Sequence, residues 1–237
     1  MPENKKILFL YNGGTIGQIS EKRGENMVLV PPKNSEIFRQ ACEPVIEKLK
    51  TEAEITFEYI TAKDSTNMSP NDWEKLIFRI KKAQDEENYD AVAIAHGTDT
   101  LAYTSTALSL ALHGKTPGKS GLKIPVCVTG AQNPIYQVGG DGRFNLENLF
   151  RVITRAIELE IADVMVNFWD KVYLGCRVLK ISEKDFDAFT SPAIPTVGII
   201  DSNGVNLKSD LLRKRSGAAE KFEIAPKFGR GVVSFEL

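Results

Sequence analysis

The sequence is poor in side chains that bind metals or form disulfides. It contains two histidines and three cysteines among 237 residues. The cysteines, Cys42, Cys127 and Cys176, are widely spaced and form no CxxC pair, so the usual zinc ligand sets cannot be assembled from nearby positions. We therefore expect neither a metal site nor a cofactor. An odd number of cysteines in apolar or mixed surroundings predicts buried thiols in a reducing compartment.

Long apolar segments and an excess of charge are lacking as well. No apolar run reaches the ~18 residues that suggest a membrane-spanning helix. The N-terminus leads directly into a short apolar run without a signal-peptide pattern. The formal net charge of -1 argues against nucleic acid or an anionic membrane as the main partner. These features predict a cytoplasmic protein that acts on a small molecule.

Short apolar runs alternate with segments of helical periodicity. Most of the runs are continuous rather than alternating, which suits parallel strands covered on both faces. The alternation predicts an α/β fold: an open, doubly wound, mostly parallel sheet of the Rossmann or flavodoxin type, with helices on both faces. The predicted strands are residues 7–11, 55–60, 91–95, 124–128, 164–168 and 197–200, and the predicted helices are 35–50, 70–85, 100–113 and 146–159.

The loops that follow four of these strands are unusually rich in Gly, Thr, Ser, Asp and Asn. They are residues 12–17, 61–68, 96–100 and 130–142. In open α/β sheets, ligands bind outside the carboxyl ends of the strands. These loops are therefore where we expect the functional site.

The first loop, Asn-Gly-Gly-Thr-Ile-Gly, presents the hydroxyl of Thr15 directly after a strand. Glycines permit positive φ and close approach of a ligand, but such a turn is also compatible with a purely structural role. A phosphate-binding loop fits poorly, because the lysine of the GxxxxGK[ST] pattern is absent and the glycine spacing differs from GxGxxG.

The third loop, His-Gly-Thr-Asp-Thr, brings two hydroxyls and a carboxylate to the start of a helix. Asp99 either takes part in a site or caps the helix. For His96 we expect a core position with a hydrogen bond to the backbone. A threonine nucleophile needs a base, and a lysine can serve if its pKa is held down. Lys180 is the candidate, although taken alone it reads as a surface lysine.

Together, six segments match the bacterial-type L-asparaginases in order and spacing. They are GGTIG, DSTNMSPNDW at 64–73, HGTDT, VTGAQNP at 128–134, DGRFNL at 141–146, and YLGCRVLK with DFDAFTSP between 173 and 192. The resemblance is closest to the cytoplasmic, type I branch and extends to about residue 200.

The resemblance implies roles for individual residues in L-asparagine hydrolysis, with L-glutamine as a second candidate substrate. Thr15 corresponds to the family's nucleophile, which forms an acyl-enzyme and releases ammonia. Thr98, Asp99 and Lys180 correspond to the group that activates water. The implied substrate-binding residues are Gly14, Asp64, Ser65, Thr66, Gly97, Thr98 and Asp99.

The resemblance also implies a division of the chain into two parts. Residues 1–205 correspond to the N-terminal catalytic domain, and 206–237 to a linker and the first strand, near 231–234, of a C-terminal α/β domain that is largely missing. With that second domain present, the family pattern is a homodimer or homotetramer. The lid segment, 21–30, lacks the tyrosine that many members have. The missing domain and the missing tyrosine leave open a catalytically impaired amino-acid-binding or assembly domain. A second alternative is the amidase subunit of a tRNA-dependent amidotransferase, which shares these motifs.

Overall fold

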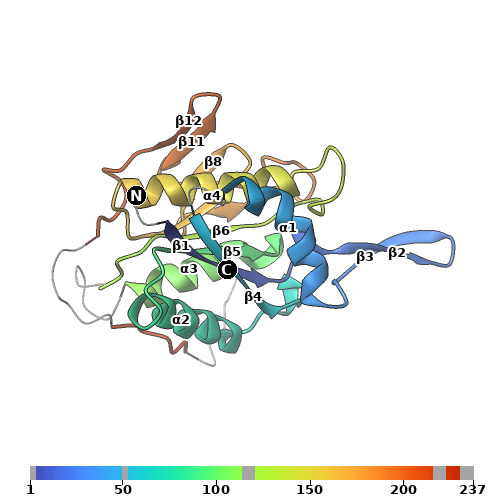
Figure 1. The fold of residues 1–237 in the computed structure, drawn as a ribbon, viewed down its shortest axis with the longest axis horizontal. Coiled ribbons are helices and arrows are strands. Elements are labelled where there is room, and N and C mark those ends of the chain that lie inside the picture. The colour runs from blue at the N-terminus through green and yellow to red at the C-terminus, as the bar shows by residue number, and fades with distance from the viewer. Residues whose placement is uncertain (1–3, 50–52, 114–120, 216–222, 230–237) are drawn as a thin grey trace, which may run out of the picture.

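An eight-stranded sheet runs through the computed structural model, which describes residues 4–49, 53–113, 121–215 and 223–229 (Figure 1). The strand order is β12-β11-β8-β7-β6-β5-β1-β4. Five neighbouring strands are parallel: β4 (Ala53–Thr61), β1 (Lys5–Asn12), β5 (Ala91–His96), β6 (Val126–Thr129) and β7 (Val164–Phe168). The sheet continues through antiparallel pairings of β8 (Lys171–Leu174), β11 (Gly198–Asp201) and β12 (Gly204–Leu207).

Two pairs of helices cover the two faces of the sheet. α1 (Ser35–Leu49) and α4 (Gly142–Glu158) lie on one face, and α2 (Pro70–Asp85) and α3 (Thr98–Leu112) on the other (Figure 1). β1 contributes to both hydrophobic cores because its side chains alternate. Phe9 and Tyr11 pack on the α1 and α4 side, and Leu8 and Leu10 on the α2 and α3 side. The predicted α/β fold, with helices on both faces, is confirmed.

The chain reverses its direction of travel across the sheet between β1 and β5. After β1 it passes to β4 on one side, then crosses to β5 on the other side and continues to β6 and β7. Such a reversal leaves a crevice at the carboxyl ends of the two central strands, where doubly wound proteins bind their ligands. The first and third glycine-rich loops meet there.

All four predicted helices are present, and two of their starts are informative. α2 begins at Pro70 as predicted, because Asp72 accepts hydrogen bonds from Ser69 N at 3.0 Å and from Ser69 Oγ at 2.6 Å. α3 begins at Thr98, two residues earlier than predicted, with Gly97 at the N-cap. Asp99 therefore lies inside the first turn, and the reading of Asp99 as the capping residue is wrong.

The structure contains short elements that the sequence did not predict. β2 (Ile19–Arg23) and β3 (Asn26–Val30) form a separate hairpin that projects from the body of the molecule (Figure 1). β9 (Leu179–Lys180) pairs with β10 (Phe189–Thr190). Two 3-10 turns, η1 (Thr15–Gly17) and η2 (Ser65–Asn67), follow β1 and β4.

Residues after β11 remain attached to the body as far as they are described. The proposed boundary between residues 205 and 206 falls inside β12. Arg213 O accepts a hydrogen bond from Ala162 N at 2.9 Å, which ties the following segment to the start of β7. The predicted strand near 231–234 lies outside the described residues. None of the described helices is long and apolar enough to cross a membrane.

The cysteines differ in their surroundings. Cys42 and Cys127 are fully buried, as predicted, and all three thiols are free. The prediction is wrong for Cys176, which is exposed because it lies in the turn that follows β8 rather than inside a strand.

Candidate active site

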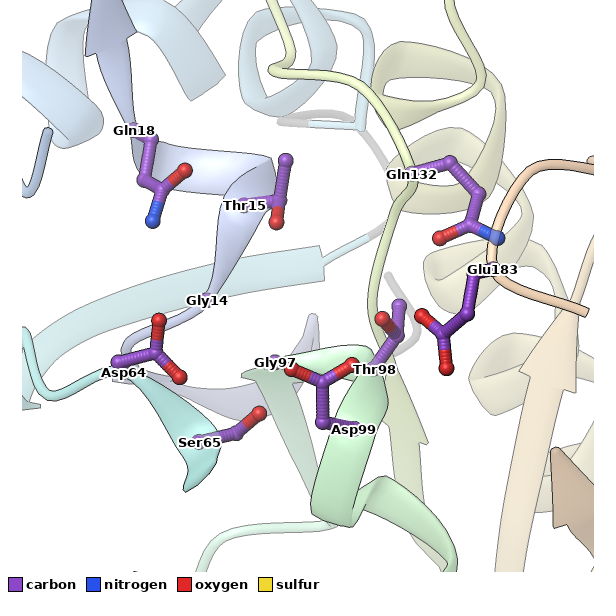
Figure 2. A pocket seen from close by; sticks show the side chains of 10 residues that line it. All are labelled: Gly14, Thr15, Gln18, Asp64, Ser65, Gly97, Thr98, Asp99, Gln132 and Glu183. Atoms are coloured by element: carbon purple, nitrogen blue, oxygen red, sulfur yellow. The ribbon is translucent and has the colours of Figure 1, made fainter. Parts of the chain in front are cut away.

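A cavity of about 230 Å³ opens at the carboxyl ends of the central strands (Figure 2). The loops after β1, β4, β5 and β6 form it, together with the turn after β9. Its lining is almost entirely polar and carries three carboxylates, two carboxamides and three hydroxyls. The lining residues are Gly14, Thr15, Gln18, Asp64, Ser65, Gly97, Thr98, Asp99, Gln132 and Glu183.

Direct backbone contact holds the loops around the cavity together. Gly14 has φ of 92°, and a Cβ atom built on it would lie 2.3 Å from Cα of Gly97. A Cβ atom on Gly97 would lie 2.5 Å from Oγ of Ser65. Only glycine permits such an approach, so these two glycines set the spacing between the loops after β1, β4 and β5.

Thr15 is the first residue of η1 and is half-buried at the wall of the cavity. Its carbonyl accepts a hydrogen bond from Gln18 N at 3.0 Å, which closes the turn. The loop is also tied to the loop after β6, because Ile135 N donates to Ile16 O at 3.0 Å. Within the described part of the chain, the Thr15 hydroxyl has no hydrogen-bond partner, and Figure 2 shows it facing the cavity.

The loop after β4 contributes Asp64 and Ser65 to the cavity but not Thr66. Asp64 Oδ1 accepts hydrogen bonds from Thr66 N at 2.9 Å and from Thr66 Oγ1 at 2.8 Å, so the Thr66 hydroxyl is engaged inside the turn. Ser65 is buried, and its carbonyl accepts a hydrogen bond from Thr100 Oγ1 at 2.8 Å. This contact anchors η2 to the start of α3.

A hydrogen-bonded cluster forms around Lys180 beside the cavity. Its Nζ lies 3.0 Å from Thr98 Oγ1, 2.7 Å from Asp99 Oδ1 and 2.5 Å from Glu183 Oε2. The Lys180 side chain is 10% exposed, so it is not the solvated surface lysine that its local sequence suggests.

The Lys180 cluster favours a charged ammonium group. Burial lowers the pKa of Lys180, but the hydrogen bonds and charges of Asp99 and Glu183 outweigh burial and leave this pKa above its usual value. A lysine can serve as a free base only if its pKa is lowered, and Lys180 does not meet this condition. Lys180 donates to Thr98, which polarises the threonine hydroxyl.

His96 occupies the core position predicted for it. It is fully buried, its Nδ1 lies 2.8 Å from Gly97 O, and its Nε2 lies 3.0 Å from Thr104 Oγ1. Thr104 also accepts a hydrogen bond from Trp73 Nε1 at 2.9 Å. Burial lowers the pKa of His96 to about 4. The imidazole is therefore neutral at pH 7 and supports the loop that carries Gly97.

Three residues of the cavity wall were missed from the sequence: Gln18, Gln132 and Glu183. Gln132 could have been identified from the sequence, because it lies within the VTGAQNP segment. Its backbone N donates to the buried Asp141 at 2.9 Å, and its Nε2 donates to the carbonyls of Ser182 and Asp185 at 3.3 and 3.2 Å. These contacts connect the loop after β6 with the turn that carries Glu183.

The structure brings together nearly all of the predicted site residues. Seven line the cavity, and Lys180 lies beside it in contact with two of them. Thr66 is the exception. In the described part of the chain, no three His, Cys, Asp or Glu side chains are grouped so that they could hold a metal ion.

Known proteins resemble the chain in both sequence and structure. It matches the family described as "Asparaginase, N-terminal" over residues 6–213. It is 36% identical over 194 residues to L-asparaginase 1 of Escherichia coli K12, an alignment that covers 81% of this chain and 52% of that protein. The chain therefore spans about half the length of this relative.

Two further relatives show the same pattern of partial coverage. The crystal structure of L-asparaginase I from Vibrio cholerae superposes with a TM-score of 0.73 at 28% identity, over 94% of this chain and 62% of that one. A glutamyl-tRNA(Gln) amidotransferase subunit from Aeropyrum pernix is 36% identical over 150 residues, 62% of this chain and 34% of that protein. With the family match over residues 6–213, the chain belongs to the asparaginase family and corresponds to its N-terminal domain.

Proposed function

We propose that this chain carries the catalytic residues of an L-asparagine amidohydrolase, with Thr15 as the nucleophile. One observation carries the proposal. A cavity lined by the free hydroxyl of Thr15 is also lined by Thr98, whose Oγ1 lies 3.0 Å from the ammonium group of Lys180. A nucleophile and a second, polarised hydroxyl on one small polar cavity suit acyl transfer from an amide.

The chemistry balances in two steps. Thr15 Oγ1 bonds to the side-chain amide carbon, the carbon–nitrogen bond breaks, and ammonia leaves with the proton lost by Thr15. Water then hydrolyses the ester on Thr15, which releases L-aspartate and restores the hydroxyl. Both steps need a proton relay between the attacking oxygen and the departing atom.

We assign this relay to Thr98. Because Lys180 donates to Oγ1 of Thr98, the Thr98 proton can point into the cavity. It can pass to the departing nitrogen while Oγ1 takes a proton from the attacking hydroxyl, and the reverse exchange serves the water step. The positive charge of Lys180 stabilises negative charge that develops on Oγ1 during the exchange.

The other end of the substrate also finds suitable partners. We assign Asp99 to its α-ammonium group, because Asp99 Oδ2 has no hydrogen-bond partner among the described residues. We assign its α-carboxylate to Ser65 and to backbone N–H groups of the two loops that contain Gly14 and Gly97. Asp64 orients the loop after β4, which carries Ser65, through its contacts with Thr66.

The test is ammonia release from L-asparagine by the purified 237-residue chain. We expect turnover that Thr15→Ala reduces by about 10⁴-fold or more, the size expected when a covalent nucleophile is removed. Thr56→Ala provides a matched control, because Thr56 is an exposed threonine on the edge strand β4. Equal rates in the wild type and Thr15→Ala would overturn the assignment of the nucleophile.

An alternative is binding without turnover. If calorimetry detects L-aspartate binding to the chain and no ammonia is released, the amino-acid-binding alternative replaces the hydrolase. The amidotransferase alternative predicts that ammonia release from an amide requires charged tRNA, and release from free L-asparagine in its absence excludes it.

We also propose a cytoplasmic location and, when the second domain is present, a homodimer or homotetramer, on the basis of the resemblance to type I asparaginases. Sedimentation of this chain joined to such a second domain tests the assembly. A monomer at all concentrations would contradict it.

A further inference from the structure

The carboxylate of Glu183 lines the cavity, and none of the proposed catalytic or binding roles uses it. Its Oε2 accepts the 2.5 Å hydrogen bond from Lys180, while Oε1 has no partner among the described residues. The side chain is 75% exposed at the cavity rim. One oxygen is therefore held by the Lys180 cluster, and the other is available to a ligand.

Glu183 lies at the opposite end of the cavity from Asp64 and Ser65. Figure 2 shows Asp64 and Ser65 on one side, Gln132 and Glu183 on the other, and Thr15, Thr98 and Asp99 between them. A substrate whose α-groups sit at Ser65 and Asp99 therefore extends its side chain past the two threonines toward Glu183.

Gln132 presents an acceptor at this same end. Its Nε2 is occupied by the carbonyls of Ser182 and Asp185, so its Oε1 is the atom that faces the cavity (Figure 2). Gln132 Oε1 and the carboxylate of Glu183 thus both line the end of the cavity where the end of the substrate side chain would lie. A carboxamide supplies two N–H donors to such a pair, whereas an ionised carboxylate supplies none and is repelled by Glu183.

We infer that Glu183 is a specificity-determining residue that selects a side-chain amide over a side-chain carboxylate and so favours release of the acidic product. This inference rests on the proposed function, because it takes the amino-acid orientation from it. Glu183 acts on the ligand through its negative charge, and secondarily positions Lys180 through the contact with Oε2.

The experiment measures the affinities of L-asparagine and L-aspartate by calorimetry in the Thr15→Ala background, where turnover is removed. Glu183→Gln keeps the shape and an acceptor for Lys180 but loses the charge. We expect the preference for L-asparagine over L-aspartate to fall about fivefold in Glu183→Gln, the size of a solvent-screened charge–charge interaction. Glu183→Asp keeps the charge and should retain most of the preference.

Asp185→Asn is the matched control, since it removes the same charge from the same turn at an exposed side chain outside the cavity lining. It should leave the preference unchanged. High salt provides a second readout, because salt screens an exposed charge. In the protein that retains Glu183, the preference for L-asparagine over L-aspartate should decrease at high salt toward the value found for Glu183→Gln.

The outcomes separate the two proposals. Binding of both amino acids with the same preference before and after the Glu183→Gln substitution overturns the role of Glu183 and leaves the proposed function standing. If neither L-asparagine nor L-aspartate binds, both the role of Glu183 and the proposed function are overturned.

Discussion

Lys180 Nζ donates to Thr98 Oγ1 over 3.0 Å, although 82 residues separate the two in the chain. The short strand β9 and the first turn of α3 bring them together. The contact places a positive charge behind a hydroxyl that lines the cavity. Its removal should therefore affect the chemical step more than substrate binding.

Lys180→Met should reduce kcat for ammonia release by about 10²- to 10⁴-fold while changing KM much less, because Lys180 stabilises the charge that develops on the Thr98 relay mainly in the transition state. Lys184→Met, at an exposed lysine four residues further along, should retain wild-type kinetics. Steady-state kinetics of both variants check this. A Lys180→Met enzyme with normal kcat would remove Lys180 from the mechanism.

Gly14→Ala should unfold or strongly destabilise the protein. The new Cβ would meet Cα of Gly97 at 2.3 Å, and the backbone at position 14 has positive φ. Strain and overlap together should cost about 3 kcal/mol of the free energy of unfolding. Gly24→Ala separates the two causes. Gly24 also has positive φ, but apart from its two chain neighbours no described residue has an atom within 4 Å of its Cβ position, so we expect a cost of about 1 kcal/mol. Urea denaturation measures both, and equal costs would contradict the close contact.

His96 should make the protein less stable in mild acid. Its pKa is about 4 in the folded protein and 6.5 as the reference value, so between these pH values the unfolded chain binds the proton more readily. The contribution of the neutral imidazole to the free energy of unfolding is fully present above pH 6.5. It decreases by up to about 3 kcal/mol as the pH falls to 4.

His96→Gln tests this pH dependence, because glutamine does not titrate. Urea midpoints at pH 7 and pH 5 should differ less in His96→Gln than in the wild type, whatever the overall stability of the variant. An unchanged difference would show that other groups cause the acid sensitivity.

A thiol reagent should modify one cysteine in the folded protein. Cys176 is exposed, whereas Cys42 and Cys127 are fully buried, and burial raises the pKa of both thiols, that of Cys127 to about 12. Titration with a chromogenic disulfide should yield one thiol in buffer and three in denaturant. Cys176→Ser should abolish the reaction in buffer, and rapid modification of the remaining thiols would contradict their burial.

The sequence was informative where local rules decide the structure. Continuous apolar runs predicted the central strands, and Ser69, Pro70 and Asp72 predicted the start of α2, because capping depends on neighbours in the chain. The hairpin of β2 and β3 was missed, since its residues are mostly exposed and show little hydrophobic alternation. α3 begins early because its N-cap is a glycine with no side-chain signal.

The same distinction applies to the candidate site. Thr15, Ser65, Thr98 and Asp99 stand in recognisable segments after predicted strands. Glu183 could not be identified, because its place depends on the turn after β9 and on hydrogen bonds from Gln132 to that turn. Only tertiary contacts give this surface glutamate a place beside the cavity.

The contact between Gly14 and Gly97 has a mechanical consequence. With no side chain between the two loops, the separation of the Thr15 and Thr98 backbones depends on main-chain atoms at the ends of adjacent strands, β1 and β5. Rotamer changes elsewhere in the cavity can alter what the two hydroxyls meet without altering how far apart their backbones lie. The spacing between the two threonine backbones is therefore set by the sheet and its main-chain contacts, not by side-chain packing inside the cavity.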